Sequence, residues 1–230
     1  SRLFYRSWKA EMAVLAVVAA LSAVGFLIFG FAQGDIRQYD GEGAFLPSAS
    51  IHLFDWAVAA VLSALLLTNA ARMWWLTTGG NPRIRPKLAS YLKALYQLPL
   101  QFLTQKEYAR CGERKPWLVH LVLMLSYLSM LVLIMFFLVD MQAGPEIRWP
   151  FHAVGYVASA GLLFGVLYAV VGRIRRSAPH VAHSHESDWV FLVQLFIVAF
   201  TGILQHVLHR AGQPLAGNVV YVVHMMAAVP

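Results

Sequence analysis

The sequence is poor in charged residues and contains a single cysteine. Asp, Glu, Lys and Arg make up 13% of the 230 residues and hydrophobic residues 59%, whereas charged residues are roughly 25% of an average soluble protein. A soluble fold could not bury so much apolar surface behind so few charges, which excludes an ordinary soluble domain and a disordered chain. Cys111 alone cannot form an internal disulfide or supply the cysteines of an iron–sulfur cluster. The composition therefore predicts an integral membrane protein.

Five continuous apolar runs are long enough to cross a bilayer, which takes about 20 residues of helix. They are Met12–Phe31, Ile51–Trp75, Trp117–Val139, Pro150–Val171 and Trp189–His209. A sixth run begins near Gly217 and is too short to span, so we expect the natural chain to continue beyond Pro230. The first run is long and lacks a cleavage site, so no signal peptide is expected. The predicted fold class is all-α, a polytopic transmembrane bundle of six helices with the last one truncated.

Basic residues are distributed unevenly between the connections. Of the 18 Lys and Arg residues, all except Arg37, Arg148 and Arg210 fall in the N-terminal segment and in the 72–116 and 173–188 connections. Connections rich in Lys and Arg stay in the cytoplasm, so we expect a cytoplasmic N-terminus. The net charge of +7 is thus explained by topology, and a nucleic-acid partner is not expected. Residues 1–75 are expected to form two spans, 76–116 a cytoplasmic connection and 117–230 helices three to six.

The 76–116 connection contains a segment with the spacing of an amphipathic helix. Its apolar residues are Leu88, Tyr91, Leu92, Leu95, Tyr96 and 98–100. With Lys87 and Lys93 between them, this pattern predicts a helix lying in the headgroup plane until Pro99 disturbs it. Two functions are open for this segment: a tether to the membrane surface, or a docking platform for a cytoplasmic partner.

Nine histidines are unusual in so apolar a chain, because an imidazole in hydrocarbon needs a partner. Four of the predicted spans carry one at membrane depth, at His120, His152, His206 and His224. His120 lies near the cytoplasmic face, and the other three are expected in one layer near the outer face. Since two histidines from facing helices can ligate the iron of a b-type haem, these four are the candidate ligands in a four-helix core. Three in one layer exceed the need of one haem, and the spare could serve a quinone or face water.

Small residues near these histidines fit either a haem or ordinary helix packing. The stripe of Gly155, Ala158, Gly161 and Gly165, and the pair Thr201–Gly202, would let a flat macrocycle approach the backbone. Packed transmembrane helices use small residues in the same way, and packing is the favoured interpretation of the stripes.

Charged residues near the outer face are also open to two interpretations. Arg148 and Arg210 could bind haem propionates, or could extend to the interface as long basic side chains do. His52 and Asp55 lie one turn apart and could supply the proton-accepting group of a quinone site, as could Asp140 or Glu146. Ordinary interfacial polarity is the alternative for each, and hydration at the interface is expected for His209 as well as His52.

Three stretches carry a resemblance to a known superfamily. They are KPWLVHLVLMLSYLSML (115–131), SDWVFLVQLFIVAFTGILQHVLH (187–209) and YVVHMM (221–226). They resemble the respiratory nitrate reductase gamma subunit superfamily, and within it the membrane subunits of heterodisulfide reductase-like and quinone-interacting oxidoreductase complexes. The resemblance implies a bacterial or archaeal cytoplasmic membrane, two b haems, menaquinone or another quinone, and cytoplasmic iron–sulfur subunits as partners.

The resemblance also implies roles for particular histidines. His120 is similar to the first ligand on the family's first haem-carrying helix, and His224 to the ligand at the outer start of its last helix. Met130 stands where the nitrate reductase branch has a second histidine, so the outer haem would take its second ligand from His152 or His206. The partner of His120 would lie beyond Pro230.

The sequence thus predicts a membrane cytochrome b subunit that transfers electrons between membrane quinone or quinol and cytoplasmic iron–sulfur subunits. Such a subunit is not catalytic alone, because it lacks the centres that handle a soluble substrate. Two alternatives are open: a histidine-lined proton channel or transporter, and a membrane anchor without cofactor.

Overall fold

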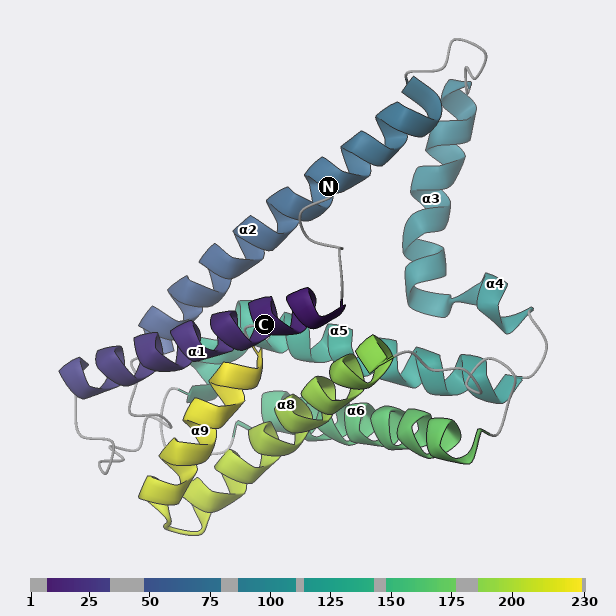
Figure 1. The fold of residues 1–230 in the computed structure, drawn as a ribbon. Helices are drawn as coiled ribbons and strands as arrows, with labels where there is room; N and C mark the ends of the chain where they lie inside the picture. Colours follow the sequence, from purple (N-terminus) through teal and green to yellow (C-terminus); the bar gives the residue numbers. More distant parts are fainter. Residues whose placement is uncertain are drawn as a thin grey trace. The chain divides into compact units, whose positions relative to one another are not determined.

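The computed structural model describes residues 8–33, 48–79, 87–110, 114–142, 148–176 and 186–228. These ranges are helical and contain no strand (Figure 1). The helices are α1 (Trp8–Gln33), α2 (Ser48–Trp74), α3 (Leu88–Thr104), α4 (Lys106–Ala109), α5 (Arg114–Gln142), α6 (Trp149–Arg175), α8 (Glu186–Arg210) and α9 (Pro214–Ala228). A π-helical turn, Trp75–Gly79, continues α2. The all-α prediction is confirmed over these ranges.

Four described helices are long and apolar enough to cross a membrane, as expected for a multi-pass membrane protein. They cover Ile51–Gly79, Arg114–Met141, Trp149–Arg175 and Asp188–Arg210, and they correspond to the second to fifth predicted spans. α1 and α9 contribute shorter apolar stretches, Met12–Gly25 and Pro214–Ala228. The count of six spans stays a prediction.

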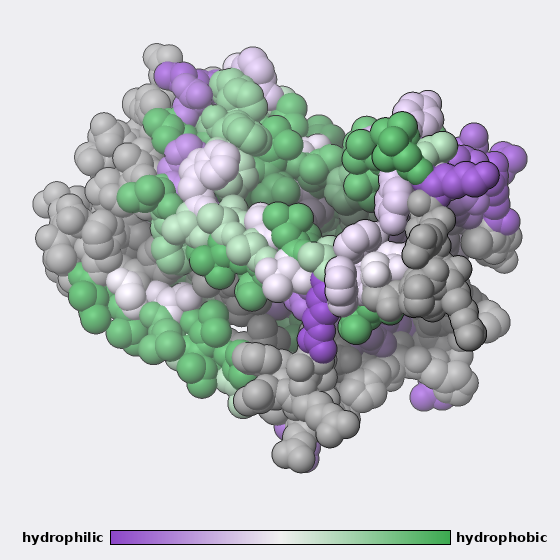
Figure 2. All heavy atoms as spheres, turned by 90° about the horizontal axis from the view of Figure 1, so that it is seen from above, coloured by the Kyte–Doolittle hydropathy of each residue, from purple (hydrophilic) through white to green (hydrophobic). Residues whose placement is uncertain are grey.

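On the face drawn in Figure 2, apolar side chains cover much of the surface of the described residues. Leu66 on α2 is 70% exposed and Val157 on α6 is 73% exposed. A soluble monomer rarely exposes large contiguous apolar patches, whereas lipid chains solvate such side chains at no cost. This surface therefore supports lipid contact along the spans.

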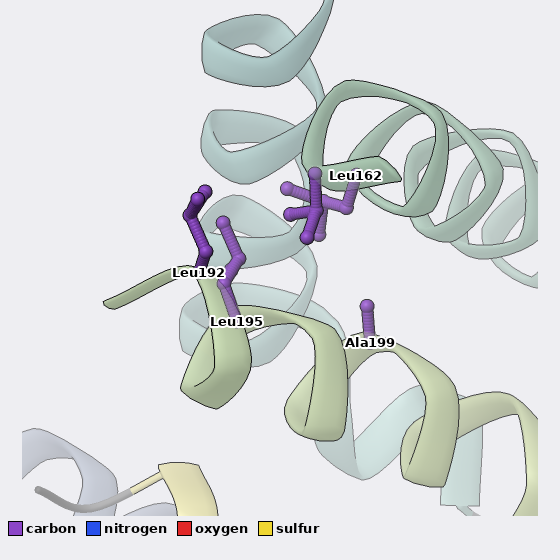
Figure 3. Packing of buried hydrophobic residues seen from close by; sticks show 5 residues of the cluster. Leu162, Leu192, Leu195 and Ala199 are labelled. Carbon is purple, nitrogen blue, oxygen red and sulfur yellow. The ribbon is translucent and has the colours of Figure 1, made fainter. Parts of the chain in front are cut away.

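The chain divides into two compact units, residues 1–50 with 122–230, and residues 51–121. In the first unit, α6 packs against α8, and α9 packs against both α8 and α1. The α6–α8 core consists of Leu162, Val166, Leu192, Leu195 and Ala199 (Figure 3). Leu162 lies on α6 and points toward the α8 side chains. His152 near the start of α6 contacts His206 near the end of α8, so these two helices run antiparallel.

Glycines on α6 allow α5 to approach closely. A Cβ atom at Gly165 would lie 2.8 Å from Leu123 Cδ1, and one at Gly161 would collide with the side chain of Ser126. At Gly155 the nearest side-chain atoms would be 3.8 Å away, an ordinary contact distance. In a bilayer, helices associate by such close packing because lipid provides no hydrophobic drive between them. The packing interpretation of this stripe is confirmed for Gly161 and Gly165.

A tight turn joins α8 to α9. Gly212 has φ +71°, a left-handed conformation that glycine adopts without steric cost. Its N–H donates to the carbonyl of His209 (3.1 Å), and the N–H of Gln213 donates to the carbonyl of Leu208 (3.0 Å). These bonds satisfy the last carbonyls of α8, and Pro214 then begins α9 at a position where a proline is tolerated. The turn folds α9 back along α8.

In the second unit, residues 51–121, the predicted amphipathic helix is present as α3. α3 continues through Pro99 and ends at Thr104. The expectation that the helix holds only as far as Pro99 is therefore wrong. A proline removes one N–H and strains the helix without ending it here. The helix stops at Gln105, whose φ of 49° and ψ of 38° are left-handed. α4 follows directly.

Candidate functional site

His152 and His206 face each other across the α6–α8 interface. His152 lies in the first turn of α6, and His206 lies one turn before the end of α8. Because these helices are antiparallel, both residues reach the same level. Their ring centres are 5.3 Å apart with the planes inclined by 55°. Tyr156, one turn after His152, meets the His206 ring edge-on at 5.6 Å. The structure therefore brings two of the four predicted ligands into contact.

The hydrogen bonds around this pair leave two imidazole nitrogens available. His152 Nδ1 lies 3.0 Å from the carbonyl oxygen of Arg148. A carbonyl can only accept, so Nδ1 carries the hydrogen and Nε2 keeps its lone pair. His206 Nε2 is buried and has no hydrogen-bond partner among the described residues. A ligand nitrogen with a lone pair, oriented by a hydrogen bond from its other nitrogen, is the usual arrangement of a metal-binding histidine.

His224 lies against α8 from the α9 side. Its Nδ1 is 3.0 Å from the Val198 carbonyl and 3.1 Å from Thr201 Oγ1. Thr201 Oγ1 itself donates to the Ile197 carbonyl at 2.5 Å. A Cβ atom on Gly202 would lie 3.2 Å from His224 Cε1. Gly202, which the sequence suggested as room for a macrocycle, thus makes room for the His224 imidazole.

His120 belongs to the 51–121 unit and is exposed there. Its Nδ1 lies 2.5 Å from Gln105 Oε1, and the ring of Tyr108 meets it edge-on at 5.5 Å. The amide oxygen accepts from Nδ1, which leaves the lone pair on Nε2. Gln105 can reach this ring because it occupies the left-handed position between α3 and α4. Sequence reasoning missed this contact between the connection and the candidate ligand.

The two candidate propionate arginines have different surroundings. Arg148 Nη1 lies 3.4 Å from Asp140 Oδ1 in a surface ion pair, and such a pair contributes about 0–1 kcal/mol. Arg148 also orients His152 through its backbone carbonyl. Arg210 is exposed at the end of α8. Glu146, an alternative quinone residue, lies outside the described residues.

The candidate quinone residues His52 and Asp55 are both half-buried on α2. The indole N–H of Trp56 donates to His52 Nε2 at 3.1 Å, and the two rings meet edge-on at 6.2 Å. His52 is therefore engaged with Trp56 on its own helix. Ordinary interfacial polarity is the alternative to a quinone site, and the contact with Trp56 is compatible with it.

A histidine–asparagine pair in the α8–α9 hairpin was missed by the sequence analysis. His209 Nε2 donates to Asn218 Oδ1 at 2.9 Å, and Asn218 is 0% exposed. A Cβ atom on Gly217 would lie 2.6 Å from the His209 ring, so glycine is required there. The ring of His209 is thus held between the helices, and because His209 is half-buried, part of it is still open to solvent. An asparagine inside an apolar run was the available signal, since a buried amide must find a partner.

Comparison with known proteins gives no relative. No family model matches the chain, and no curated protein or solved structure is significantly similar to it. The function of the site is therefore argued from the side chains that form it.

Two histidines are the kind of donor pair that a haem iron takes from a protein. Within the described ranges no three His, Cys, Asp or Glu side chains gather as a metal-ligand group, whereas structural zinc takes four protein ligands. A haem iron takes one or two axial ligands from the protein. A metal–imidazole bond is about 2 Å long, so two rings on opposite sides of one ion have centres about 6 Å apart. The observed 5.3 Å between the ring centres is shorter than that value, so the two rings would have to move apart to hold one ion.

Proposed function

We propose that the chain is the membrane cytochrome b subunit of a respiratory oxidoreductase complex, in which His152 and His206 would hold a b-type haem. One observation carries the proposal: the two rings come from separate helices into contact, and Nε2 of His206 is buried without a partner. An unsatisfied buried polar atom costs about 1–3 kcal/mol. Coordination to iron would remove that cost.

A bound haem would supply one-electron chemistry, and the residues around it would hold and tune it. The Arg148 carbonyl accepts from His152 Nδ1, which fixes the tautomer and raises the basicity of Nε2 as a ligand. The Tyr156 ring packs against the edge of His206 and restricts its rotation. Arg148 and Arg210 are the candidates to neutralise haem propionates.

We further propose that this subunit exchanges electrons between menaquinone or another membrane quinone and cytoplasmic iron–sulfur subunits. The support is the resemblance of residues 115–131, 187–209 and 221–226 to the superfamily named above. Under this proposal His120 and His224 stay separate candidate haem ligands, with the partner of His120 expected beyond Pro230. Each has its Nδ1 bound to an oxygen acceptor, which leaves the lone pair of Nε2 for a metal. His52 and Asp55 stay the candidates for quinone binding, and the N-terminus is expected on the cytoplasmic side of the inner membrane.

Absorbance spectroscopy of the purified full-length chain separates this proposal from its alternatives. The chain is expressed with haem supplied, and its reduced-minus-oxidised spectrum is recorded together with a pyridine haemochrome assay. An α-band with protohaem in fixed ratio to the chain is expected. A haem-free chain that conducts protons across vesicle membranes would instead identify a histidine-lined channel. A haem-free chain that conducts none would identify a plain anchor.

A further inference from the structure

α3 has a narrow polar stripe on an otherwise apolar helix. The stripe consists of Ser90, Lys93, Gln97, Gln101 and Thr104, which recur every three or four residues. Such spacing places them on one face. The remaining positions are leucine, tyrosine, phenylalanine, alanine and Pro99, and Pro99 lies one turn after Leu95 on the apolar side. A helix that is apolar around most of its circumference and carries one lysine is suited to burial rather than to full hydration.

Most of this apolar face is exposed. Leu88 is 75% exposed, Tyr96 is 72%, and Leu95 and Leu98 are each 67%. Gln101, on the polar stripe, is the half-buried exception, because its side chain contacts Glu107 at the start of α4. The helix therefore turns its polar side toward its own connection and leaves its apolar side open.

Two tryptophans at the ends of membrane spans hold the two ends of α3. Trp74, at the end of α2, donates its indole N–H to Tyr91 Oη at 3.3 Å. Trp117, in the first turn of α5, donates to the Thr104 carbonyl at 3.1 Å. Trp74 and Trp117 thus bind the first and the last turn of α3, respectively. Tryptophan at a span end lies at the level of the lipid headgroups.

The length of α3 decides its direction relative to the membrane. Its 17 residues give a helix about 25 Å long at 1.5 Å per residue, whereas the hydrocarbon core is about 30 Å thick. α3 also carries Lys93 and Gln97 near its middle. Because a helix this short with two polar residues near its middle is unsuited to crossing the hydrocarbon core, we expect α2 to end and α5 to begin at the same face. Since both ends of α3 are held at that face, its axis runs along the membrane surface.

We propose that α3 is embedded in the leaflet where α2 ends and α5 begins, with phospholipid as the occupant of its apolar face. The leucine and aromatic side chains enter the acyl-chain region, and the stripe of five polar residues faces the headgroups. Lys93 belongs to the stripe, Lys87 directly precedes α3 and Lys106 begins α4, and their positive charges match the negative charge of lipid phosphates. The proposal is independent of the haem, because it rests on α2, α3 and α5 alone.

Spin labels on the full-length chain test this placement. In a Cys111→Ser background, single cysteines are introduced on the apolar side (Leu92→Cys, Leu95→Cys) and on the polar stripe (Ser90→Cys, Gln97→Cys). Each variant is labelled and reconstituted in nanodiscs of phosphatidylcholine and phosphatidylglycerol. Accessibility to oxygen, which partitions into lipid, is compared with accessibility to a water-soluble nickel chelate. The ratio is expected to be several-fold higher at 92 and 95 than at 90 and 97.

Two results would overturn the proposal. Equal nickel access at all four positions would show that α3 is hydrated outside the bilayer. Protection from both reagents at 92 and 95 would show that protein, such as a second copy of the chain, covers the apolar face. A label at Val157 provides the reference for full lipid access, because Val157 is an exposed position on the span α6. The introduced cysteines stand at exposed positions and are expected to disturb packing little.

Discussion

The contact between His209 and Asn218 gives a stability prediction that a double-variant cycle can test. Asn218→Leu removes the acceptor of the His209 N–H, and His209→Phe removes the donor to Asn218 Oδ1. Asn218 is 0% exposed, whereas His209 is half-buried and water can reach part of its ring. A buried group that loses its partner costs about 1–3 kcal/mol, and a hydrogen bond between membrane helices contributes about 0.6 kcal/mol on average and up to about 1.7.

We therefore expect His209→Phe and Asn218→Leu each to lower the free energy of unfolding by about 1 kcal/mol. The double variant should cost less than the sum of the singles by roughly 1 kcal/mol, since the interaction can be lost only once. The assay is unfolding of the detergent-solubilised chain by sodium dodecyl sulfate, followed by circular dichroism. Val219→Leu, at an exposed neighbouring position, is the control with no expected change. Strict additivity of the two single changes would refute the reasoning.

Glycine positions give two further predictions that the same unfolding assay checks. Gly165→Ala should destabilise by about 1–3 kcal/mol through overpacking against Leu123, whereas Gly155→Ala, with open contact distances, should be neutral or stabilise by up to about 1 kcal/mol; equal effects would contradict the packing described for α5 and α6. Gly212→Ala should cost about 1 kcal/mol because its φ of +71° is strained for alanine, and a stability equal to that of the unchanged chain would show that the turn is not held in this conformation.

The sequence predicted the spans well because continuous hydrophobicity is a local property. The expected runs starting at Ile51, Trp117, Pro150 and Trp189 each fall within a helix long enough to cross a membrane. The periodicity of α3 also sufficed to predict a helix. Its end did not follow from Pro99, because a proline in a helix costs one hydrogen bond and the left-handed Gln105 marks the actual end.

The site was predictable in its residues and not in its pairings. Burial cost alone identified the membrane histidines, but their partners depend on how the helices are aligned. The antiparallel register of α6 and α8 brings His152 to His206, and the left-handed turn at Gly212 directs α9 so that His224 reaches the Val198 carbonyl. Spacing along the chain contains neither register nor turn direction, which is why His152, His206 and His224 were expected as one undivided set.

The most direct test of the haem proposal is haem content per chain in ligand variants compared with a neighbour that contacts the same ring. His152→Ala and His206→Ala are purified beside Tyr156→Phe, which keeps the ring contact and removes no ligand. Each histidine variant is predicted to lose one haem per chain, with Tyr156→Phe unchanged. Haem content equal to that of the unchanged chain in both histidine variants would contradict iron ligation by His152 and His206.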